Sequence, residues 1–249
     1  MIHPEFREPV RAILLDIEGT TTTIAFVHET LFPYARRRLA AFLARHGSDP
    51  AVLADLAALR EEHAADAPLG PPPLPEGDLA AVPYLHWLMD LDRKSTPLKS
   101  LQGAIWREGY RAGDLKSEIF PDVPPALARW RAQGRRICIY SSGSVLAQQQ
   151  LFAHTTAGDL TAAFSNYFDT RIGPKRAPES YAGIAQELAL PPAEILFLSD
   201  IAEELQAAHQ AGLQTALSIR PGNAPQTPLP FAPEVAGFDE VFPVKRYPV

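Results

Sequence analysis

The chain carries short apolar runs in which apolar and polar positions do not alternate. A strand buried on both faces of a parallel sheet shows this pattern. The runs are Arg11–Leu15, Arg136–Tyr140, Tyr167–Asp169, Ile195–Ser199 and Thr215–Ile219. Helical segments alternate with them from residue 124 onward, at Pro124–Gln133, Ser144–Phe152, Tyr181–Leu188 and Glu203–Ala211. Strands that alternate with helices predict parallel βα units with right-handed crossovers, and therefore an α/β fold.

The stretch from Phe26 to Arg111 shows helical spacing and no buried-strand pattern. Its apolar positions recur every three or four residues at first, and a segment rich in Ala, Leu and Glu follows. A proline-rich run then excludes a helix and predicts a loop. The expected helices are centred on Leu31–Leu43, Ala51–Ala65, Asp78–Leu91 and Pro97–Arg111, and the loop is Pro68–Pro75.

This change of pattern predicts two domains. We expect residues 1–25 and 113–249 to form a Rossmann-like parallel-sheet core, and residues 26–112 to form an inserted all-helical cap domain. The tail beyond Pro221 is rich in proline and is expected to loop over the surface, with Glu240–Phe242 as a candidate edge strand.

Composition narrows the class of protein. The 249 residues include 23 basic and 29 acidic side chains, a formal charge of −6, which argues against a general nucleic-acid binder. The single cysteine, Cys138, lies in an apolar run and is interpreted as a buried structural thiol. The polar N-terminus and the lack of a long apolar stretch predict no membrane contact. We expect a cytoplasmic monomer that acts on a small phosphorylated metabolite.

Polar residues follow the predicted strands, and ligands of open α/β sheets bind beyond the carboxyl ends of strands. Carboxylates follow the first and fourth strands, hydroxyls the second, and an ammonium group lies in the loop after the third. These residues are Asp16, Glu18, Ser141, Ser142, Lys175, Asp200, Glu203 and Glu204. Together they supply what a site for a phosphate group and a metal ion needs.

Each of these signals alone has a simpler interpretation. Asp16 and Glu18 share a face if the chain stays extended, and they then form either a nucleophile and proton donor or two acids that end a strand. Ser141 and Ser142 lie just before a helix, where they either hold a phosphate or belong to a segment in which Ser142 or Ser144 simply caps the helix. Lys175 either neutralises a phosphoryl group or is an ordinary surface lysine.

The ordered set resembles the haloacid dehalogenase superfamily of phosphatases. Asp16-Ile17-Glu18-Gly19-Thr20 matches the first motif of that superfamily, with Glu in place of the usual second Asp. Ser141 matches the second motif, Lys175 the third, and Asp200 with Glu204 the fourth.

Longer runs resemble the acireductone synthases, the bifunctional enolase-phosphatases of methionine salvage, in which Glu is usual at the position of Glu18. These runs are Leu14–Thr22, Ile24–Val27, Leu31–Tyr34, Leu115–Ser117, Ile119–Val123, Ile139–Val145, Phe168–Thr170, Glu179–Tyr181 and Arg220–Asn223. One position departs from the pattern, since Gln149 stands where the family has Lys.

The resemblance implies a substrate and a role for each residue. The family enolises 2,3-diketo-5-methylthiopentyl-1-phosphate and then removes its phosphate. Asp16 would be the nucleophile and a Mg²⁺ ligand. Glu18 would ligate Mg²⁺ through its backbone carbonyl and act as acid and base. Ser141, Ser142 and Lys175 would hold the substrate, Asp200 would complete the Mg²⁺ site, and Glu204 would support the ligands from behind.

Three alternatives remain open on the sequence. Another phosphatase of the superfamily, acting on a sugar phosphate or glycolate phosphate, would keep the same motifs. A metal-free dehalogenase would not need Asp200 and Glu204. An inert phosphometabolite-binding protein would not need the complete set of Asp16, Glu18, Lys175 and Asp200.

Overall fold

The fold was analysed in a computed structural model, which describes residues 6–243 except for the side chain of Asp78. The described chain divides into two compact units, residues 6–27 with 116–243, and residues 28–115. Each unit has its own apolar core.

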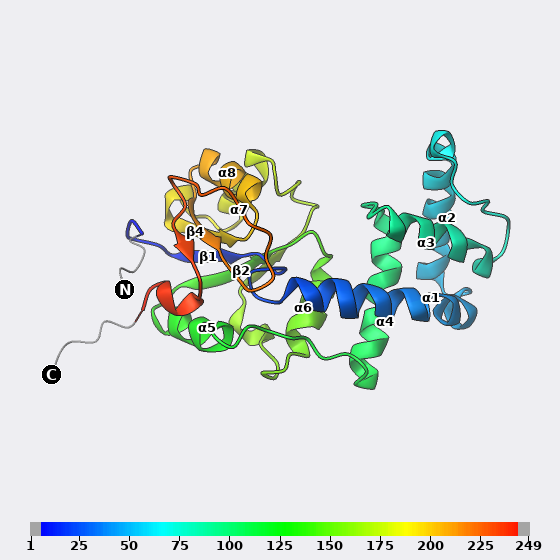
Figure 1. The fold of residues 1–249 in the computed structure, drawn as a ribbon, viewed down its shortest axis with the longest axis horizontal. Coiled ribbons are helices and arrows are strands. Elements are labelled where there is room, and N and C mark those ends of the chain that lie inside the picture. Colours follow the sequence, from blue (N-terminus) through cyan, green and yellow to red (C-terminus); the bar gives the residue numbers. More distant parts are fainter. Residues whose placement is uncertain (1–5, 244–249) are drawn as a thin grey trace. The chain divides into compact units, whose positions relative to one another are not determined.

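The first unit is built on a six-stranded parallel sheet. Figure 1 shows the sheet lying between the helices of this unit. The strands lie in the order β3-β2-β1-β4-β5-β6. Their bounds are β1 Ala12–Leu15, β2 Arg136–Tyr140, β3 Asn166–Phe168, β4 Ile195–Ser199, β5 Gln214–Ser218 and β6 Glu234–Val235. The five strands predicted from apolar runs are present, and the expected α/β fold with a Rossmann-like core is confirmed.

Helices cover both faces of this sheet, which explains why its central strands β1 and β4 are buried along their whole length. In Figure 1, α7 and α8 lie on one side of the strands and α5 on the other. The helices of this unit are α5 Val123–Ala132, α6 Val145–Ala153, α7 Pro178–Glu187 and α8 Ala202–Gln210, with short 3₁₀ turns at Thr161–Ala163, Pro192–Glu194 and Phe238–Glu240.

Alternate residues along each strand point to opposite faces of the sheet. Leu14, Tyr140 and Phe197 belong to one apolar cluster, which also contains residues of α7 and α8. Because successive side chains of a strand point to opposite faces, Asp16 lies in phase with Leu14, and Ser199 with Phe197. Side chains at the end of β1 and β4 are therefore directed towards the α7 and α8 side.

The edge strand predicted at Glu240–Phe242 is wrong. The sheet ends instead on β6, Glu234–Val235, and Phe238–Glu240 forms a single helical turn. The carbonyl groups that a strand at 240–242 would offer to a neighbour accept side-chain donors instead. Trp130 Nε1 donates to the Val241 carbonyl at 2.8 Å, and Arg129 Nε donates to the Phe242 carbonyl at 3.1 Å.

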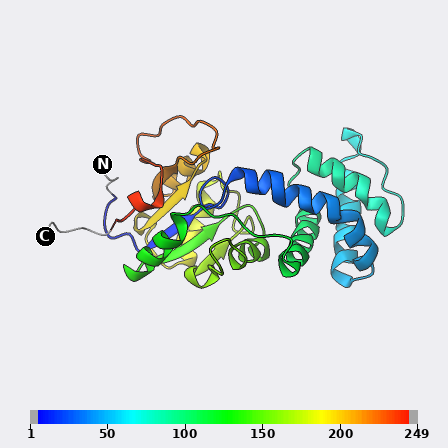
Figure 2. The same ribbon diagram turned by 60° about the horizontal axis from the view of Figure 1, so that its bottom comes forward.

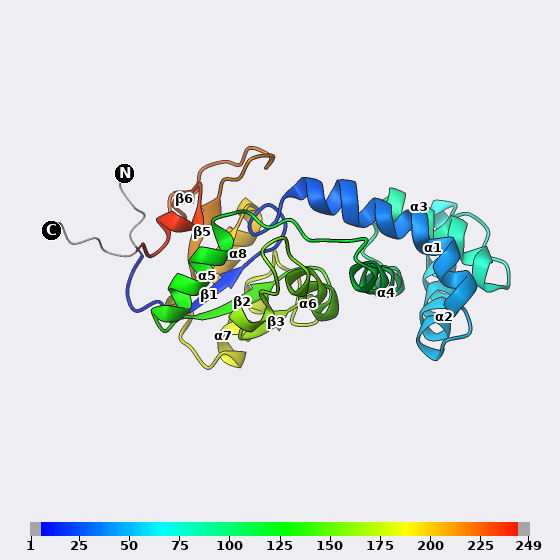
Figure 3. The ribbon, with the colours of Figure 1, turned by 90° about the horizontal axis from the view of Figure 1, so that it is seen from below.

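The second unit contains helices and loops but no strand among its described residues (Figures 2 and 3). Its helices are α1 Phe32–His46, preceded by a wide π-helical segment at Phe26–Leu31, α2 Pro50–Ala65, α3 Val82–Asp90 and α4 Thr96–Ala112, with 3₁₀ turns at Ala67–Leu69 and Asp78–Ala81. The apolar faces of α1, α2, α3 and α4 form one core. Ser95 caps α4 by accepting from Leu98 N, and Gly113 ends it at φ +79°.

The helix predicted at Asp78–Leu91 is interrupted near its start. A 3₁₀ turn covers Asp78–Ala81, and α3 begins at Val82 with Pro83 in its first turn. Proline has no N–H to donate and collides with a carbonyl four residues earlier, so it is tolerated at a helix start and not in a helix interior.

Candidate active site

The strand order creates one place where polar side chains can gather. The chain leaves β1 towards β2 and β3 on one side, and later returns to β4 on the other side of β1. The carboxyl ends of β1 and β4 therefore form the switch point of the sheet, where α/β proteins bind ligands. Leu15 pairs with Leu198 in the register, so Asp16 and Ser199 are the next residues on each strand, and Asp200 follows.

Asp16 is buried, with 5% of its surface exposed. Its Oδ1 accepts a hydrogen bond from the Ile17 N–H at 2.7 Å and contacts Lys175 Nζ at 2.7 Å. Its Oδ2 faces the Ser199 hydroxyl at 3.3 Å. The carboxylate is thus held on both oxygens by elements that are remote from each other in the sequence.

Lys175 reaches this site from the loop between β3 and α7. Its ammonium group lies between Asp16 Oδ1 and Glu204 Oε2, at 2.7 and 2.5 Å. Burial alone would lower the pKa of Lys175, but the two carboxylates outweigh it and raise the pKa above its usual value. Lys175 is a buried cation that bridges two acids, not a surface lysine.

Glu204 lies in the first turn of α8, where the negative charge of an acidic side chain interacts favourably with the helix dipole. Burial raises the pKa of Glu204, and the nearby Lys175 opposes that rise. The Ser199 hydroxyl lies 3.0 Å from Glu204 Oε2 and 3.3 Å from Asp16 Oδ2, so its single proton can be donated to either carboxylate but not to both at once. Glu204 contacts both Lys175 and Ser199 beside Asp16, and its direct contact with Lys175 was not foreseen by the sequence analysis.

Asp200 is also buried, with 5% of its surface exposed. Burial and then the charge of Asp16 raise its pKa to about 7. Gly19 comes so close to it that a Cβ on Gly19 would overlap the Asp200 carboxylate. The first motif and the fourth motif therefore meet at this point.

The segment after Asp16 turns sharply. The N–H groups of Thr20, Thr21 and Thr22 point to the Ile17 carbonyl at 2.9 to 3.3 Å, and Gly19 adopts φ +66°. The extended geometry on which a shared face of Asp16 and Glu18 depended is therefore absent, since the chain bends at Ile17. Glu18 lies on this turn and is half-buried.

Ser141 and Ser142 follow β2, the strand next to β1. Their loop is fixed by its own hydrogen bonds, because the Gly143 N–H donates to Ser141 Oγ at 3.2 Å and Ser144 caps α6. The helix cap is thus Ser144, which leaves both earlier serines outside the capping position. Because β1 and β2 are parallel neighbours, this serine loop lies at the same edge of the sheet as Asp16.

Gln148 was missed by sequence reasoning. It is buried, and its Nε2 donates to the Gly143 and Phe168 carbonyls, both at 2.8 Å. These bonds join the serine loop to the end of β3. No clear signal in the sequence pointed to it, because three consecutive glutamines, residues 148–150, occupy the middle of this helix. Its neighbour Gln149 is exposed.

Asn223 was also missed, although its run was noted as part of the resemblance. Its Nδ2 donates to the Gly19 carbonyl at 2.9 Å and to the Ser218 carbonyl at 3.2 Å. The loop after β5 is therefore tied to the turn after β1. Arg220 strengthens this tie, because its Nε donates to the Thr20 carbonyl at 3.2 Å.

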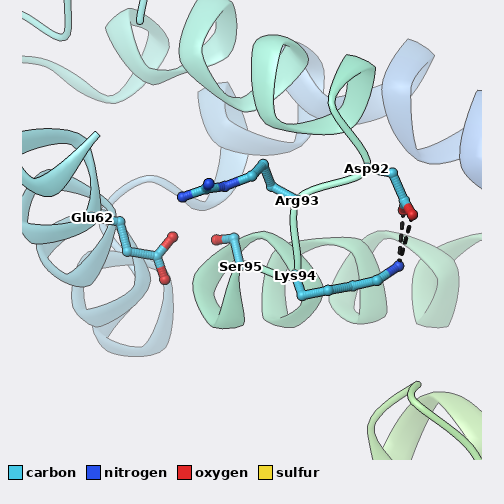
Figure 4. Close-up of a pocket in the computed structure, with 5 residues that line it drawn as sticks. All are labelled: Glu62, Asp92, Arg93, Lys94 and Ser95. Atoms are coloured by element: carbon cyan, nitrogen blue, oxygen red, sulfur yellow. Dashed lines mark hydrogen bonds and ion pairs between the residues drawn. The ribbon is translucent and has the colours of Figure 1, made fainter. Parts of the chain in front are cut away.

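A separate cavity of about 530 Å³ lies within the helical unit (Figure 4). It is lined by Glu62, Asp92, Arg93, Lys94 and Ser95. Lys94 pairs with Asp92 in it at 2.9 Å, and both side chains are mostly exposed. This cavity contains none of the site residues predicted from the sequence, which all lie in the α/β unit.

The donor set at the strand ends fits a magnesium ion. Asp16 and Asp200 offer two hard carboxylates, and Mg²⁺ usually takes only one or two carboxylates from a protein. The three acids Asp16, Asp200 and Glu204 face one ammonium group, so a divalent cation would offset the excess negative charge. A cluster of three or more His, Cys, Asp or Glu arranged around a metal position does not occur within residues 6–243.

None of the helices in the described chain has both the length and the apolar character that crossing a membrane requires. Cys138 is fully buried as expected, and burial raises the pKa of its thiol to about 12.

The chain is similar to known proteins over most of its length. The family model of the haloacid dehalogenase-like hydrolases matches residues 10–212. Enolase-phosphatase E1 of Synechococcus elongatus is 57% identical over 216 residues, which cover 86% of this chain and 91% of that protein. The Enolase-phosphatase E1 of Methylococcus capsulatus is 49% identical over 234 residues, 94% of this chain and 98% of that protein. The resemblance drawn from the motifs is confirmed.

Solved structures show the same fold. The UTR4 protein of Saccharomyces cerevisiae superposes with a TM-score of 0.75 at 32% identity, covering 93% of this chain and 99% of that one. CbbY of Rhodobacter sphaeroides, solved in complex with phosphate, gives a TM-score of 0.59 at 19% identity, over 95% and 98% of the two chains.

Proposed function

The chain belongs to the haloacid dehalogenase-like hydrolase family, and from this premise we propose that it is an enolase-phosphatase of methionine salvage. Its proposed substrate is 2,3-diketo-5-methylthiopentyl-1-phosphate, which it converts to the acireductone and phosphate. The observation that carries the phosphatase assignment is the buried cluster in which Lys175 Nζ lies 2.7 Å from Asp16 Oδ1 at the switch point of the sheet.

Asp16 is the proposed nucleophile. One of its carboxylate oxygens attacks phosphorus, and the bond from phosphorus to the substrate oxygen breaks. The leaving oxygen takes a proton from Glu18, and Asp16 carries the phosphoryl group as an aspartyl-phosphate. Water then attacks this phosphorus, Glu18 accepts the proton, and Asp16 and inorganic phosphate are released.

Lys175 and the serine loop are proposed to hold the phosphoryl group. The ammonium group of Lys175 already touches Asp16, so it can neutralise the charge of a phosphate that approaches the same carboxylate. Ser141 and Ser142 come from the loop that precedes α6, where backbone N–H groups and hydroxyls suit an anion. Positioning and charge neutralisation supply most of the catalysis in such reactions.

Mg²⁺ is the proposed cofactor, and Asp16, Asp200 and the Glu18 backbone carbonyl would hold it. When bound, it would screen the repulsion between the Asp16 carboxylate and the phosphate and would polarise an oxygen of the substrate. Glu204 keeps Lys175 and Ser199 in place beside these ligands. For the enolisation, Glu18 is the proposed base that removes the proton from the carbon next to a carbonyl. Residues 26–112 are proposed to be the cap insertion that recognises the organic part of the substrate.

Replacing Asp16 with Asn tests the nucleophile. The two side chains have the same shape, so we expect the circular-dichroism spectrum to be retained while phosphate release falls at least about a thousandfold. Asp159→Asn is the matched control, because Asp159 is exposed on a loop of the α/β unit, where its carboxylate accepts from Thr161, and its loss should leave the rate unchanged. Continued turnover by the Asp16→Asn protein would exclude Asp16 as the nucleophile.

The pathway assignment needs a second measurement. Purified protein is given the diketo-phosphate with and without Mg²⁺, while enol absorbance and released phosphate are followed together. Both signals appearing only with Mg²⁺ support the proposal. Release of phosphate from simple esters alone would retain the Asp16 chemistry and reject the pathway, and binding without turnover would reject the enzyme.

A further inference from the structure

The loop that carries Lys175 is held at three successive backbone carbonyls. Tyr140 OH donates to the Gly173 carbonyl at 2.9 Å, and Ser180 Oγ donates to the Pro174 carbonyl at 2.8 Å. Tyr181 OH donates to the Lys175 carbonyl at 2.7 Å. The donors come from β2 and α7, and all three side chains are at most 1% exposed. We call Tyr140, Ser180 and Tyr181 the hydroxyl clamp.

The loop passes the clamp at close range. Gly173 adopts φ +136°, and a Cβ at this position would overlap Ser180 Oγ. Only glycine therefore allows the chain to approach the clamp in this conformation. Burial raises the pKa of both tyrosine hydroxyls, so they remain protonated and act as donors at any working pH.

Aromatic rings also lie near the ammonium group of Lys175. Lys175 Nζ lies 5.9 Å from the ring centroids of Tyr140 and of Phe197. The ring of Tyr181 packs against both, 5.5 Å from Tyr140 and 5.2 Å from Phe197. A cation within about 6 Å of an aromatic face is attracted to it. The clamp tyrosines thus hold the backbone of the lysine loop through their hydroxyls, and the ring of Tyr140 also lies beside the ammonium group of Lys175.

A lysine at the end of a loop needs such support. Its long side chain has several rotatable bonds, and about 2 kcal/mol of rotamer entropy opposes a single fixed position. Residues 173–175 of the described chain pair with no strand, so the sheet does not fix this loop. A shift of its backbone by about 1 Å would move the ammonium group out of hydrogen-bonding distance of Asp16, and misplacement of this size can cost about a hundredfold in rate.

We infer that Tyr140, Ser180 and Tyr181 are positioning residues that fix the Lys175 ammonium group against Asp16 and thereby against the phosphoryl group. This inference rests on the proposed phosphatase function. It gives a role in catalysis to three hydroxyl groups that act through the backbone of the lysine loop.

Tyr181→Phe tests the clamp, because it removes one donor and keeps the ring. We expect kcat on p-nitrophenyl phosphate to fall about tenfold, with a smaller change in KM. Tyr167→Phe is the matched control. Tyr167 lies on β3, and its buried hydroxyl has no hydrogen-bond partner within the described residues, so its removal should leave kcat within about twofold of the wild type.

A double-mutant cycle with Lys175→Met separates positioning from a merely structural role. If Tyr181 acts through Lys175, Tyr181→Phe weakens the binding of inorganic phosphate in the wild type but changes it less than about twofold when Met replaces Lys175. An equal loss in both backgrounds would overturn the inference. Because Lys175→Met leaves two buried acids unpaired and can unfold the site, amide hydrogen exchange of residues 173–177 provides a second measurement.

Amide hydrogen exchange of residues 173–177 should be at least about tenfold faster in the Tyr181→Phe protein than in the Tyr167→Phe protein. Unchanged exchange together with unchanged kcat would overturn the clamp. A wild-type protein that neither binds phosphate nor cleaves the ester would instead reject the proposed function. In that case the hydrogen-exchange comparison still decides whether the Tyr181 hydroxyl holds the loop.

Discussion

At the scale of single residues, the candidate site contains more acidic than basic side chains. Asp16, Asp200 and Glu204 are buried together with one ammonium group, that of Lys175. Ionised groups lose hydration energy when they are buried, so an unbalanced cluster raises the free energy of the folded state. Folded proteins keep such clusters at functional sites, where a substrate or cation completes the charge balance.

Gly19 lies very close to the Asp200 carboxylate, and we expect Gly19→Ala to disrupt this close approach. The new methyl group would overlap the Asp200 carboxylate, and φ +66° is unfavourable for alanine. Gly70→Ala is the matched control, because Gly70 has φ +67° but open space around it. We expect the control to lose about 1 kcal/mol of unfolding free energy, and Gly19→Ala to lose about 1–3 kcal/mol more and nearly all activity.

Urea unfolding followed by circular dichroism measures this difference, with phosphate release measured in parallel. Equal losses of stability in the two variants would mean that the Asp200 carboxylate moves away without cost. The close approach of Gly19 would then have no part in holding the site.

At the scale of elements, the loops of the candidate site are tied to one another at the carboxyl edge of the sheet. Gln148 joins the serine loop to the end of β3, and Asn223 joins the loop after β5 to the turn after β1. Asp169, directly after β3, accepts from the Val145 N–H at 3.3 Å at the start of α6. Each tie uses a polar side chain that is buried or half-buried.

Asp169→Asn should weaken the tie between β3 and α6. One carboxylate oxygen accepts from Val145 and the other from the Arg171 N–H at 3.0 Å, so an amide NH₂ would face one of these donors. Burial opposes ionisation of Asp169, but its hydrogen bonds with Arg171 prevail and lower its pKa below the usual 3.8. The stabilisation is therefore complete well above pH 3.8 and is lost as the pH falls through the lowered pKa.

We expect Asp169→Asn to cost about 1–2 kcal/mol of unfolding free energy at about pH 7. The difference from the wild type should shrink as the pH is lowered past 3.8, because the wild-type carboxyl group then becomes neutral as well. Thermal unfolding of both proteins between about pH 7 and about pH 3 checks this. A constant difference across that range would show that charge has no part in the tie.

The sequence predicted β1 to β5 because each contains a largely apolar, buried run, but it missed β6, in which Glu234 is exposed. It also placed Asp16 and Asp200 correctly at the ends of β1 and β4, since the ends of adjacent parallel strands must meet. It could not show the bend at Ile17, which depends on three local N–H groups sharing one carbonyl. Nor could it show the path of Lys175, because that path depends on rings from β2 and α7 that are distant in the sequence.

At the scale of the whole molecule, the candidate site lies in one compact unit, and residues 28–115 form the other. The α/β unit is formed by residues from both sides of that insertion, and it contains every site residue named by the motifs. The helical unit has a separate core of its own. A ligand that binds only to the strand ends should therefore stabilise the first unit directly and leave the core of the second unchanged.

Magnesium binding alone tests this division without relying on activity. When Mg²⁺ is added without substrate, we expect amide hydrogen exchange to slow at residues 16–22 and 199–201, since these segments carry the proposed ligands. Exchange in α2, which lies in the helical unit, should stay unchanged. Asp200→Asn is the control, because the loss of one of two carboxylate ligands should abolish the protection. Protection centred on Glu62 and Asp92 would place the cation in the cavity of Figure 4 instead, and no protection anywhere would reject Mg²⁺ binding by the free protein.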